Sequence, residues 1–171
     1  YGFARSRNGA VNMHAVTCLP VITGKWLHKG GGCLYGNAGM YPLDWGLVMG
    51  LDARDKSIRE LDMCRLGPIL LGNKGDLKGG PPVKAMLIQN TNPAVVCPDQ
   101  NSVHAGFRRD DLFLVVHEQF MTETAEFADI VLPATMFLEH DDMYTGGGHV
   151  YFSVTKQIID APGQCRSNHE L

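Results

Sequence analysis

The chain has 171 residues, of which 44% are hydrophobic and 19% charged, and its 15 basic and 18 acidic residues give a net charge of −3. This composition is typical of a globular protein, and the densest basic spots, Arg5/Arg7 and Arg108/Arg109, are too small for the basic footprint of a nucleic-acid binder. Apolar runs such as Leu112–Val116 are far shorter than the roughly 20 residues that a membrane-spanning helix needs, so no membrane span is expected.

The first half of the chain is predicted to hold one long helix and two long loops. Apolar residues recur at helical spacing over Arg7–Thr23, where Pro20 should kink or end the helix. Gly24–Ser57 and Gly72–Pro82 are rich in glycine and proline and are predicted loops, with a short helix over Ser57–Leu66 between them.

The second half alternates between apolar runs and helical patterns. The apolar runs are predicted to be buried strands and are Val83–Ile88, Leu112–Val116 and Ile130–Leu132, the last stopped by Pro133. Helices are predicted over Asp99–Arg109, capped by its first residue, and over Glu123–Phe127, capped by Thr122. The strand–helix alternation predicts an α/β fold with a Rossmann-like parallel sheet and right-handed crossovers.

Polar clusters follow each predicted strand, where open parallel sheets bind their ligands. Asn and Thr side chains can bind ribose hydroxyls and base edges, and a Glu at a strand tip can accept from guanine or a ribose diol. We therefore expect Asn92 and Glu118 to share one cleft at this edge of the sheet. Ordinary turn chemistry, a rim histidine and a simple helix cap are the alternative interpretations. The clusters are Asn90/Thr91/Asn92, His117/Glu118, and Glu139/His140/Asp141, with Thr122 as a helix start that could face an anion.

Metal sites within the chain are not expected. The His117-Glu118 pair begins like a HExxH zinc motif, but the fifth position is Met121. Five scattered cysteines without a CxxC pair exclude a zinc or iron–sulfur motif and favour reduced thiols. This cysteine usage favours the cytoplasm, with the periplasm as the alternative. The cysteines are Cys18, Cys33, Cys64, Cys97 and Cys165.

Two stretches resemble one known family. Phe120–Ala125 reads FMTETA and Ala128–Thr135 reads ADIVLPAT, followed by Leu138-Glu139. Together they resemble the signature of the molybdopterin oxidoreductases, the dimethyl sulfoxide reductase family, which includes formate dehydrogenases and nitrate reductases. Shorter matches follow the family's order at Gly2–Gly9, Leu19–Gly24, Gly30–Gly32, Val83–Ala85, Asn92-Pro93, Val115–Glu118 and Pro162-Gly163.

The resemblance implies that the chain helps to bind a molybdopterin guanine dinucleotide carrying molybdenum or tungsten. Residues 1–82 would bridge from a preceding α/β domain, and residues 83–171 would form a Rossmann-like cofactor-binding segment. The implied contacts fall near the pterin at the N-terminus and near the nucleotide at the strand ends. They are Tyr1, Gly2, Arg5, Thr91, Asn92, His117, Glu118, Thr122 and His140.

The resemblance also implies that this is an internal segment of a larger enzyme. The main partner of the segment is then the rest of its own polypeptide, and an iron–sulfur electron-transfer subunit is a second possible partner. Any 4Fe-4S cluster would belong to a missing upstream part. We expect the segment alone to be inactive, with no catalytic residue or metal ligand. One alternative is a structural or electron-relay relative without molybdenum, like the large iron–sulfur subunit of respiratory NADH dehydrogenase. Another is a stand-alone nucleotide-binding module. The well-kept motif from Phe120 to Glu139 favours the enzyme.

Overall fold

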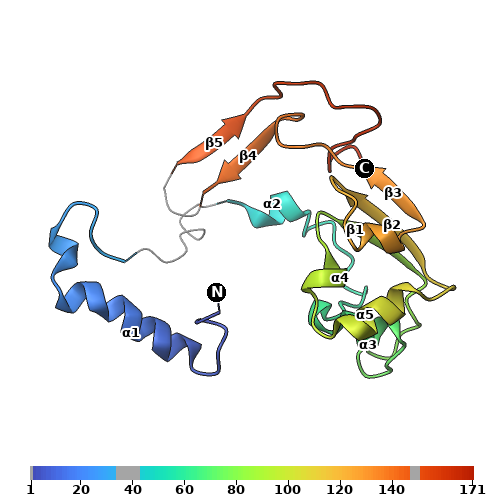
Figure 1. The fold of residues 1–171 in the computed structure, drawn as a ribbon, viewed down its shortest axis with the longest axis horizontal. Coiled ribbons are helices and arrows are strands. Elements are labelled where there is room, and N and C mark those ends of the chain that lie inside the picture. The colour runs from blue at the N-terminus through green and yellow to red at the C-terminus, as the bar shows by residue number, and fades with distance from the viewer. Residues whose placement is uncertain (1, 34–42, 147–150) are drawn as a thin grey trace. The chain divides into compact units, whose positions relative to one another are not determined.

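The computed structural model describes residues 2–33, 43–146 and 151–171. The chain divides into two compact units, shown as a ribbon in Figure 1. One unit comprises Tyr1–Leu43 with Met143–Ser153, and the other comprises Asp44–Asp142 with Val154–Leu171. The division at residue 82 that the family resemblance implies stays a prediction.

The N-terminal unit is built on helix α1, Gly9–Ile22, followed by the single turn η1, Lys25–Leu27. The predicted helix is confirmed, and Pro20 lies within its last turn. Gly24 follows with a φ of 65°, a left-handed conformation that glycine adopts without steric cost, and its N–H donates to the Val21 carbonyl at 3.1 Å.

Residues 44–71 hold three short helical segments, and an acidic cap begins two of them. The Asp44 carboxylate accepts from Leu47 N–H at 3.2 Å and begins α2, Trp45–Met49, within the segment expected to be entirely loop. The Asp62 carboxylate accepts from Cys64 N–H at 2.9 Å and begins η3, Met63–Arg65, which leads into α3, Leu66–Leu70.

The helix predicted over Ser57–Leu66 is therefore wrong in its position. The Asp55 carboxylate accepts from Ser57 N–H at 2.8 Å, which forms a side-chain turn in place of a first helical turn. Helical structure begins only at Met63. The loop predicted over Gly72–Pro82 is confirmed, because no helix or strand is assigned there.

Three parallel strands form the central sheet, in the order β1-β2-β3. They are β1, Ala85–Gln89, β2, Phe113–Glu118, and β3, Ile130–Pro133. Leu87 pairs with Val115, and Val115 pairs with Ile130. The predicted parallel sheet is confirmed, although Pro133 is the last residue of β3 rather than the residue that stops it.

Helices cover one face of this sheet, as Figure 1 shows for α3, α4 and α5. Helix α5, Gln100–Phe107, confirms the predicted crossover, and the Asp99 carboxylate caps it by accepting from Ser102 N–H. Helix α4, Pro93–Val96, was not predicted. The buried core between helices and sheet consists of Leu70, Ile88, Ala94, Val103, Phe107, Leu112, Leu114, Val116 and Ala125.

The second crossover is shorter than predicted. In place of a helix over Glu123–Phe127, the chain forms one 3₁₀ turn, η4, Ala125–Phe127. The backbone N–H of Thr124 donates to the Asn92 side-chain oxygen at 3.2 Å, so the first residues of the expected helix are tied to another loop.

The other face of the sheet is largely apolar and exposed, except at His117, which the C-terminal stretch covers. Strand alternation and register place Leu87, Phe113, Val115 and Ile130 on the face opposite the core, and we call these residues the open face. The exposed fractions of Leu87, Phe113 and Ile130 are 54%, 49% and 43%. Parallel sheets in globular proteins are normally covered on both faces, so this arrangement is unusual for a finished domain.

Residues after the sheet form a two-stranded sheet of β4, Asp142–Thr145, and β5, Phe152–Thr155. The C-terminal stretch then returns to the end of β3, where Arg166 N–H donates to the Pro133 carbonyl at 3.0 Å. Among the described residues, no helix combines the length and the apolar character needed to cross a lipid bilayer.

Candidate functional site

The three parallel strands end together, and we call this border the carboxyl edge. Gln89 lies opposite His117, and Asn90 N–H donates to the His117 carbonyl at 3.2 Å. Asn90 turns the chain out of β1 with a φ of 53°, a left-handed conformation that asparagine tolerates better than most residues. Asn92, which follows β1, and Glu118, the last residue of β2, thus lie at the same edge of the sheet, and that they share one cleft stays a prediction.

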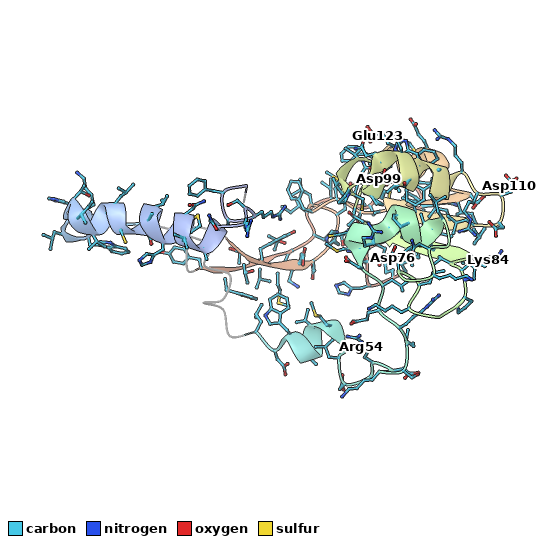
Figure 2. All side chains as sticks on the ribbon, turned by 90° about the horizontal axis from the view of Figure 1, so that it is seen from below. Arg54, Asp76, Lys84, Asp99, Asp110 and Glu123 are labelled. Atoms are coloured by element: carbon cyan, nitrogen blue, oxygen red, sulfur yellow. The ribbon has the colours of Figure 1, made fainter. Side chains whose placement is uncertain are left out.

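The two ends of the sheet differ in the charged groups that lie near them. Within the unit that contains the sheet, Figure 2 shows Asp99 and Glu123 toward one end, and Lys84 and Asp110 toward the other. This agrees with the topology, because Glu123 follows β2 whereas Lys84 and Asp110 precede strands. Asn92, His117 and Glu118, three of the predicted ligand residues, lie at the carboxyl edge.

Asn92 links the loops that follow β1 and β2. Its side-chain oxygen accepts from the Thr124 hydroxyl at 2.7 Å, and its amide N–H donates to the Glu123 carboxylate at 2.7 Å. The Thr124 hydroxyl also accepts from Ala94 N–H at 3.0 Å and has no exposed surface. The hydrogen bond from Asn92 is the main cause that lowers the pKa of Glu123. We call Asn92, Ala94, Glu123 and Thr124 the loop clamp.

Glu118 lies at the tip of the middle strand and is half-buried. One of its carboxylate oxygens accepts from Gln119 N–H at 2.8 Å. The second oxygen has no hydrogen-bond partner within the described part of the chain. Gln119 in turn donates to the Thr135 carbonyl at 2.8 Å, which ties the end of β2 to the end of β3.

His117 has no exposed surface, and its Nε2 lies 3.1 Å from the Arg166 carbonyl oxygen. That contact requires a proton on Nε2, which leaves Nδ1 as an acceptor in the neutral ring. Nδ1 is buried and has no hydrogen-bond partner among the described residues. His117 therefore anchors the C-terminal stretch to the sheet, and its role toward a ligand stays a prediction.

His140 joins the carboxyl edge through Thr135. The Thr135 hydroxyl lies 2.8 Å from His140 Nδ1, and Thr135 N–H donates to the same Arg166 carbonyl that His117 contacts. On its other side, His140 Nε2 lies 3.7 Å from the Asp142 carboxylate. The Arg166 carbonyl thus links His117 to Thr135, and the Thr135 hydroxyl links that pair to His140.

The remaining predicted contacts divide between the two units. Thr91 is exposed at the carboxyl edge, and its side chain has no hydrogen-bond partner among the residues that the structure describes. The Thr122 hydroxyl accepts at 3.3 Å from the N–H of Ala125, the first residue of η4, which agrees with the alternative interpretation of Thr122 as a helix cap. Gly2 and Arg5 are exposed in the N-terminal unit, and Tyr1 lies outside the described residues.

Sequence reasoning missed Thr124, Thr135 and Arg166. Thr124 lies within the FMTETA stretch, where a second threonine just before a buried alanine was an available signal. Thr135 lies two residues after Pro133, which ends β3, and this position next to a strand end was a comparable signal. Arg166 acts through its backbone carbonyl, 49 residues from His117 along the chain, and no local pattern reveals such a contact.

The opposite edge of the sheet is closed by ion pairs. The Asp111 carboxylate pairs with Arg109 at 2.8 Å and with Lys84, and these two partners, Arg109 first, hold the pKa of Asp111 far below its usual range. Arg109 also donates to the Val83 carbonyl at 3.3 Å. Asp111 at this edge is therefore engaged in ion pairs, whereas Glu118 at the carboxyl edge keeps one carboxylate oxygen without a partner among the described residues.

The described residues contain no cluster of side chains that could form a metal centre. No group of three or more His, Cys, Asp or Glu residues there could hold an ion. The carboxyl edge instead offers a carboxylate, a hydroxyl and an imidazole, which suit the sugar and base of a nucleotide.

Comparison with known proteins identifies relatives. The molybdopterin oxidoreductase family model matches residues 55–171. The probable oxidoreductase YoaE of Bacillus subtilis is 41% identical over 165 residues, 96% of this chain and 23% of that protein. The periplasmic nitrate reductase of Desulfovibrio desulfuricans is 42% identical over 85 residues, 49% of this chain and 11% of that protein.

A third relative, the trimethylamine-N-oxide reductase of Haemophilus influenzae, is 27% identical over an alignment covering 100% of this chain and 24% of that protein. The chain thus spans less than a quarter of the length of these relatives.

Proposed function

Because the chain belongs to the molybdopterin oxidoreductase family, we propose that its carboxyl edge holds the nucleotide end of a molybdopterin guanine dinucleotide. When bound, the pterin chelates molybdenum or tungsten and supplies the redox chemistry of the whole enzyme. The part assigned to this segment is to hold and orient the cofactor.

One observation carries this proposal: Glu118 is a half-buried carboxylate at the tip of the middle parallel strand, with one oxygen left without a partner among the described residues. In Rossmann-like folds, an acidic side chain near the carboxyl edge accepts hydrogen bonds from ribose hydroxyls. A carboxylate is equally suited to accept from two N–H groups of a guanine base. Glu118 is therefore the side chain to which we assign the direct contact.

The neighbouring groups fit the same ligand in different ways. The exposed hydroxyl of Thr91 is available for contacts to ribose or phosphate, and the half-buried His140, held by Thr135 through Nδ1, would contact the ligand through Nε2. The buried Nδ1 of His117 fits a single donor, either an ordered water or a ligand hydroxyl. Asn92 uses its side-chain oxygen within the loop clamp, so we assign it a positioning role. The family pattern adds Tyr1, Gly2 and Arg5 near the pterin as part of this proposal.

The test is Glu118→Gln in the full-length polypeptide that contains this segment. A lost hydrogen bond to a charged group is worth roughly 1.5–3 kcal/mol, so cofactor retention should fall by about tenfold or more. The readouts are the guanine nucleotide released on acid hydrolysis and the melting temperature of the cofactor-free protein. We expect reduced nucleotide content with an unchanged melting temperature.

Glu126→Gln is the matched control, because Glu126 is an exposed acid in η4 with the same charge. It should leave cofactor content unchanged. Normal nucleotide content in Glu118→Gln together with a lower melting temperature would assign Glu118 a structural role instead. Molybdenum and tungsten analysis of the unmodified full-length protein separates the enzyme from an electron-relay relative without either metal.

We further propose that the rest of the same polypeptide covers the open face and helix α1. Within α1, Val11, Leu19 and Ile22 have exposed fractions of 70%, 55% and 77%. Apolar surface of this extent is expected to be buried in a stable soluble protein. A segment that corresponds to less than a quarter of its relatives leaves ample polypeptide for this purpose.

A further inference from the structure

Two cysteines that are distant in sequence lie close together beside the loop clamp. Cys64 is exposed in η3, and Cys97 is the half-buried residue that ends α4. The Cys97 thiol lies 3.7 Å from the Met63 carbonyl oxygen, the carbonyl group of the peptide bond that joins Met63 to Cys64. A sulfur–oxygen contact thus places Cys97 next to the backbone of Cys64.

This contact sets an upper limit on the distance between the two cysteines. A carbonyl oxygen lies about 2.8 Å from the Cα of the following residue in a trans peptide, so the Cys97 sulfur is within about 6.5 Å of the Cys64 Cα. The Cys64 sulfur lies about 2.8 Å from its own Cα, so a Cys64 side chain turned toward Cys97 would bring the two sulfurs to within about 4 Å of each other. Because η3 is a single exposed turn, closure requires rotation of the Cys64 side chain and a shift of that turn toward Cys97.

The electrostatics of the two thiols agree with this proximity. Burial is the main cause that raises the pKa of the Cys97 thiol, and the nearby Cys64 raises it further, because two thiolates repel each other. Cys97 is therefore the more protected member of the pair, and the exposed Cys64 is the member that meets oxidants first.

We propose that Cys64 and Cys97 are an oxidation-sensitive pair that a peroxide closes into a disulfide. The Cys64 thiolate attacks one peroxide oxygen, the O–O bond breaks, and water leaves after protonation, so that Cys64 becomes a sulfenic acid. The Cys97 sulfur then attacks the Cys64 sulfur, its proton leaves with the displaced hydroxide, and a second water forms. Two thiols are oxidised, and one hydrogen peroxide is reduced to two waters.

The cross-link would act on the carboxyl edge through α4. Helix α4 begins directly after Asn92 and ends at Cys97, so tying Cys97 to η3 fixes the helix that carries the loop clamp. The oxidised form should therefore restrain residues 91–97 more firmly than the reduced form. This inference is independent of the ligand assigned to Glu118.

The experiment uses the full-length polypeptide, treated with hydrogen peroxide or with dithiothreitol, blocked with N-ethylmaleimide and mapped by mass spectrometry without reduction. We expect a linked pair of peptides containing Cys64 and Cys97 after oxidation, with loss of both maleimide adducts. Dithiothreitol should restore both adducts. Amide exchange of residues 91–97 should slow in the oxidised form.

Cys64→Ser and Cys97→Ser should each abolish the linked peptide, whereas Cys165→Ser should retain it as the matched control. The proposal is overturned if both thiols remain open to alkylation after oxidation, if Cys64 proceeds to a sulfinic acid while Cys97 stays reduced, or if either cysteine pairs with a different one.

Discussion

Thr124 has no exposed surface, and its single hydroxyl group joins the loops that follow β1 and β2. It donates to the Asn92 side chain and accepts from Ala94 N–H, so both of its hydrogen-bonding functions are used. Buried polar groups of this kind cost free energy only when a partner is lost. The clamp therefore holds the position of the loop that carries Thr91.

Replacing Thr124 with valine should destabilise the protein by about 1–3 kcal/mol, because the change keeps the side-chain shape and leaves Ala94 N–H buried without its acceptor. Thr124→Ser should retain most of the stability. Chemical denaturation of the full-length polypeptide measures the difference. Thr91→Val, which changes an exposed hydroxyl, is the control and should change the unfolding free energy little. Equal effects of the two valine variants would contradict the clamp.

At the scale of elements, helices α3 and α5 approach each other closely at two glycines. A Cβ atom on Gly67 would lie 2.6 Å from the Ser102 Cβ, and one on Gly106 would lie 2.5 Å from the Leu70 Cβ. These separations are below any ordinary contact between carbon atoms. The glycines therefore set the distance at which α3 can cover the core.

Gly67→Ala should destabilise the protein by about 1–3 kcal/mol through overpacking, even though alanine favours a helix by nearly 1 kcal/mol. The atoms that the new methyl group would meet include the Ser102 and Val103 backbone, which cannot simply rotate away. Gly75→Ala is the matched control, because its nearest neighbour is a side-chain oxygen at 3.4 Å. The measurement is the thermal unfolding midpoint of both variants. An unchanged midpoint for Gly67→Ala would show that the two helices can move apart without loss of stability.

At the scale of the whole molecule, the sheet carries apolar side chains on both faces, but the structure covers only one of these faces with helices. Leu114 and Val116 of β2 are buried beneath the helices, whereas Phe113 on the same strand is 49% exposed on the open face. Strand residues with apolar side chains on both faces are typical of sheets that are covered on both sides. The covering layer proposed for the open face would complete that arrangement.

Leu87→Asp tests this layer in the full-length polypeptide. If the open face is covered there, losing the buried leucine alone should cost about 1.5–3 kcal/mol, and the buried charge should add to it. Leu71→Asp is the control, since Leu71 ends α3 on the helical side with a similar exposed fraction of 52%. A melting temperature lowered equally by both variants, or by neither, would mean that the open face has no cover.

Local patterns were sufficient for the parallel sheet and for the main helices. The apolar runs around Leu87, Val115 and Val131 predicted three strands, because a buried strand needs only a short apolar segment between polar residues. Asp99 predicted the start of α5, because a capping side chain binds a backbone N–H only three positions away in the sequence. The family resemblance likewise came from contiguous stretches and was confirmed by comparison.

Contacts between distant residues were decided by the tertiary structure alone. The Asn92–Thr124 hydrogen bond spans 32 residues and the His117–Arg166 contact spans 49, so no local spacing encodes either one. The same holds for Cys64 and Cys97, which the sequence presents as scattered thiols. The sequence by itself determined which segments become the three parallel strands and which edge carries polar groups, but it did not reveal β4 and β5. Only folding, which brings the ends of parallel strands together, determined which of those groups are used to hold loops and which keep capacity for a ligand.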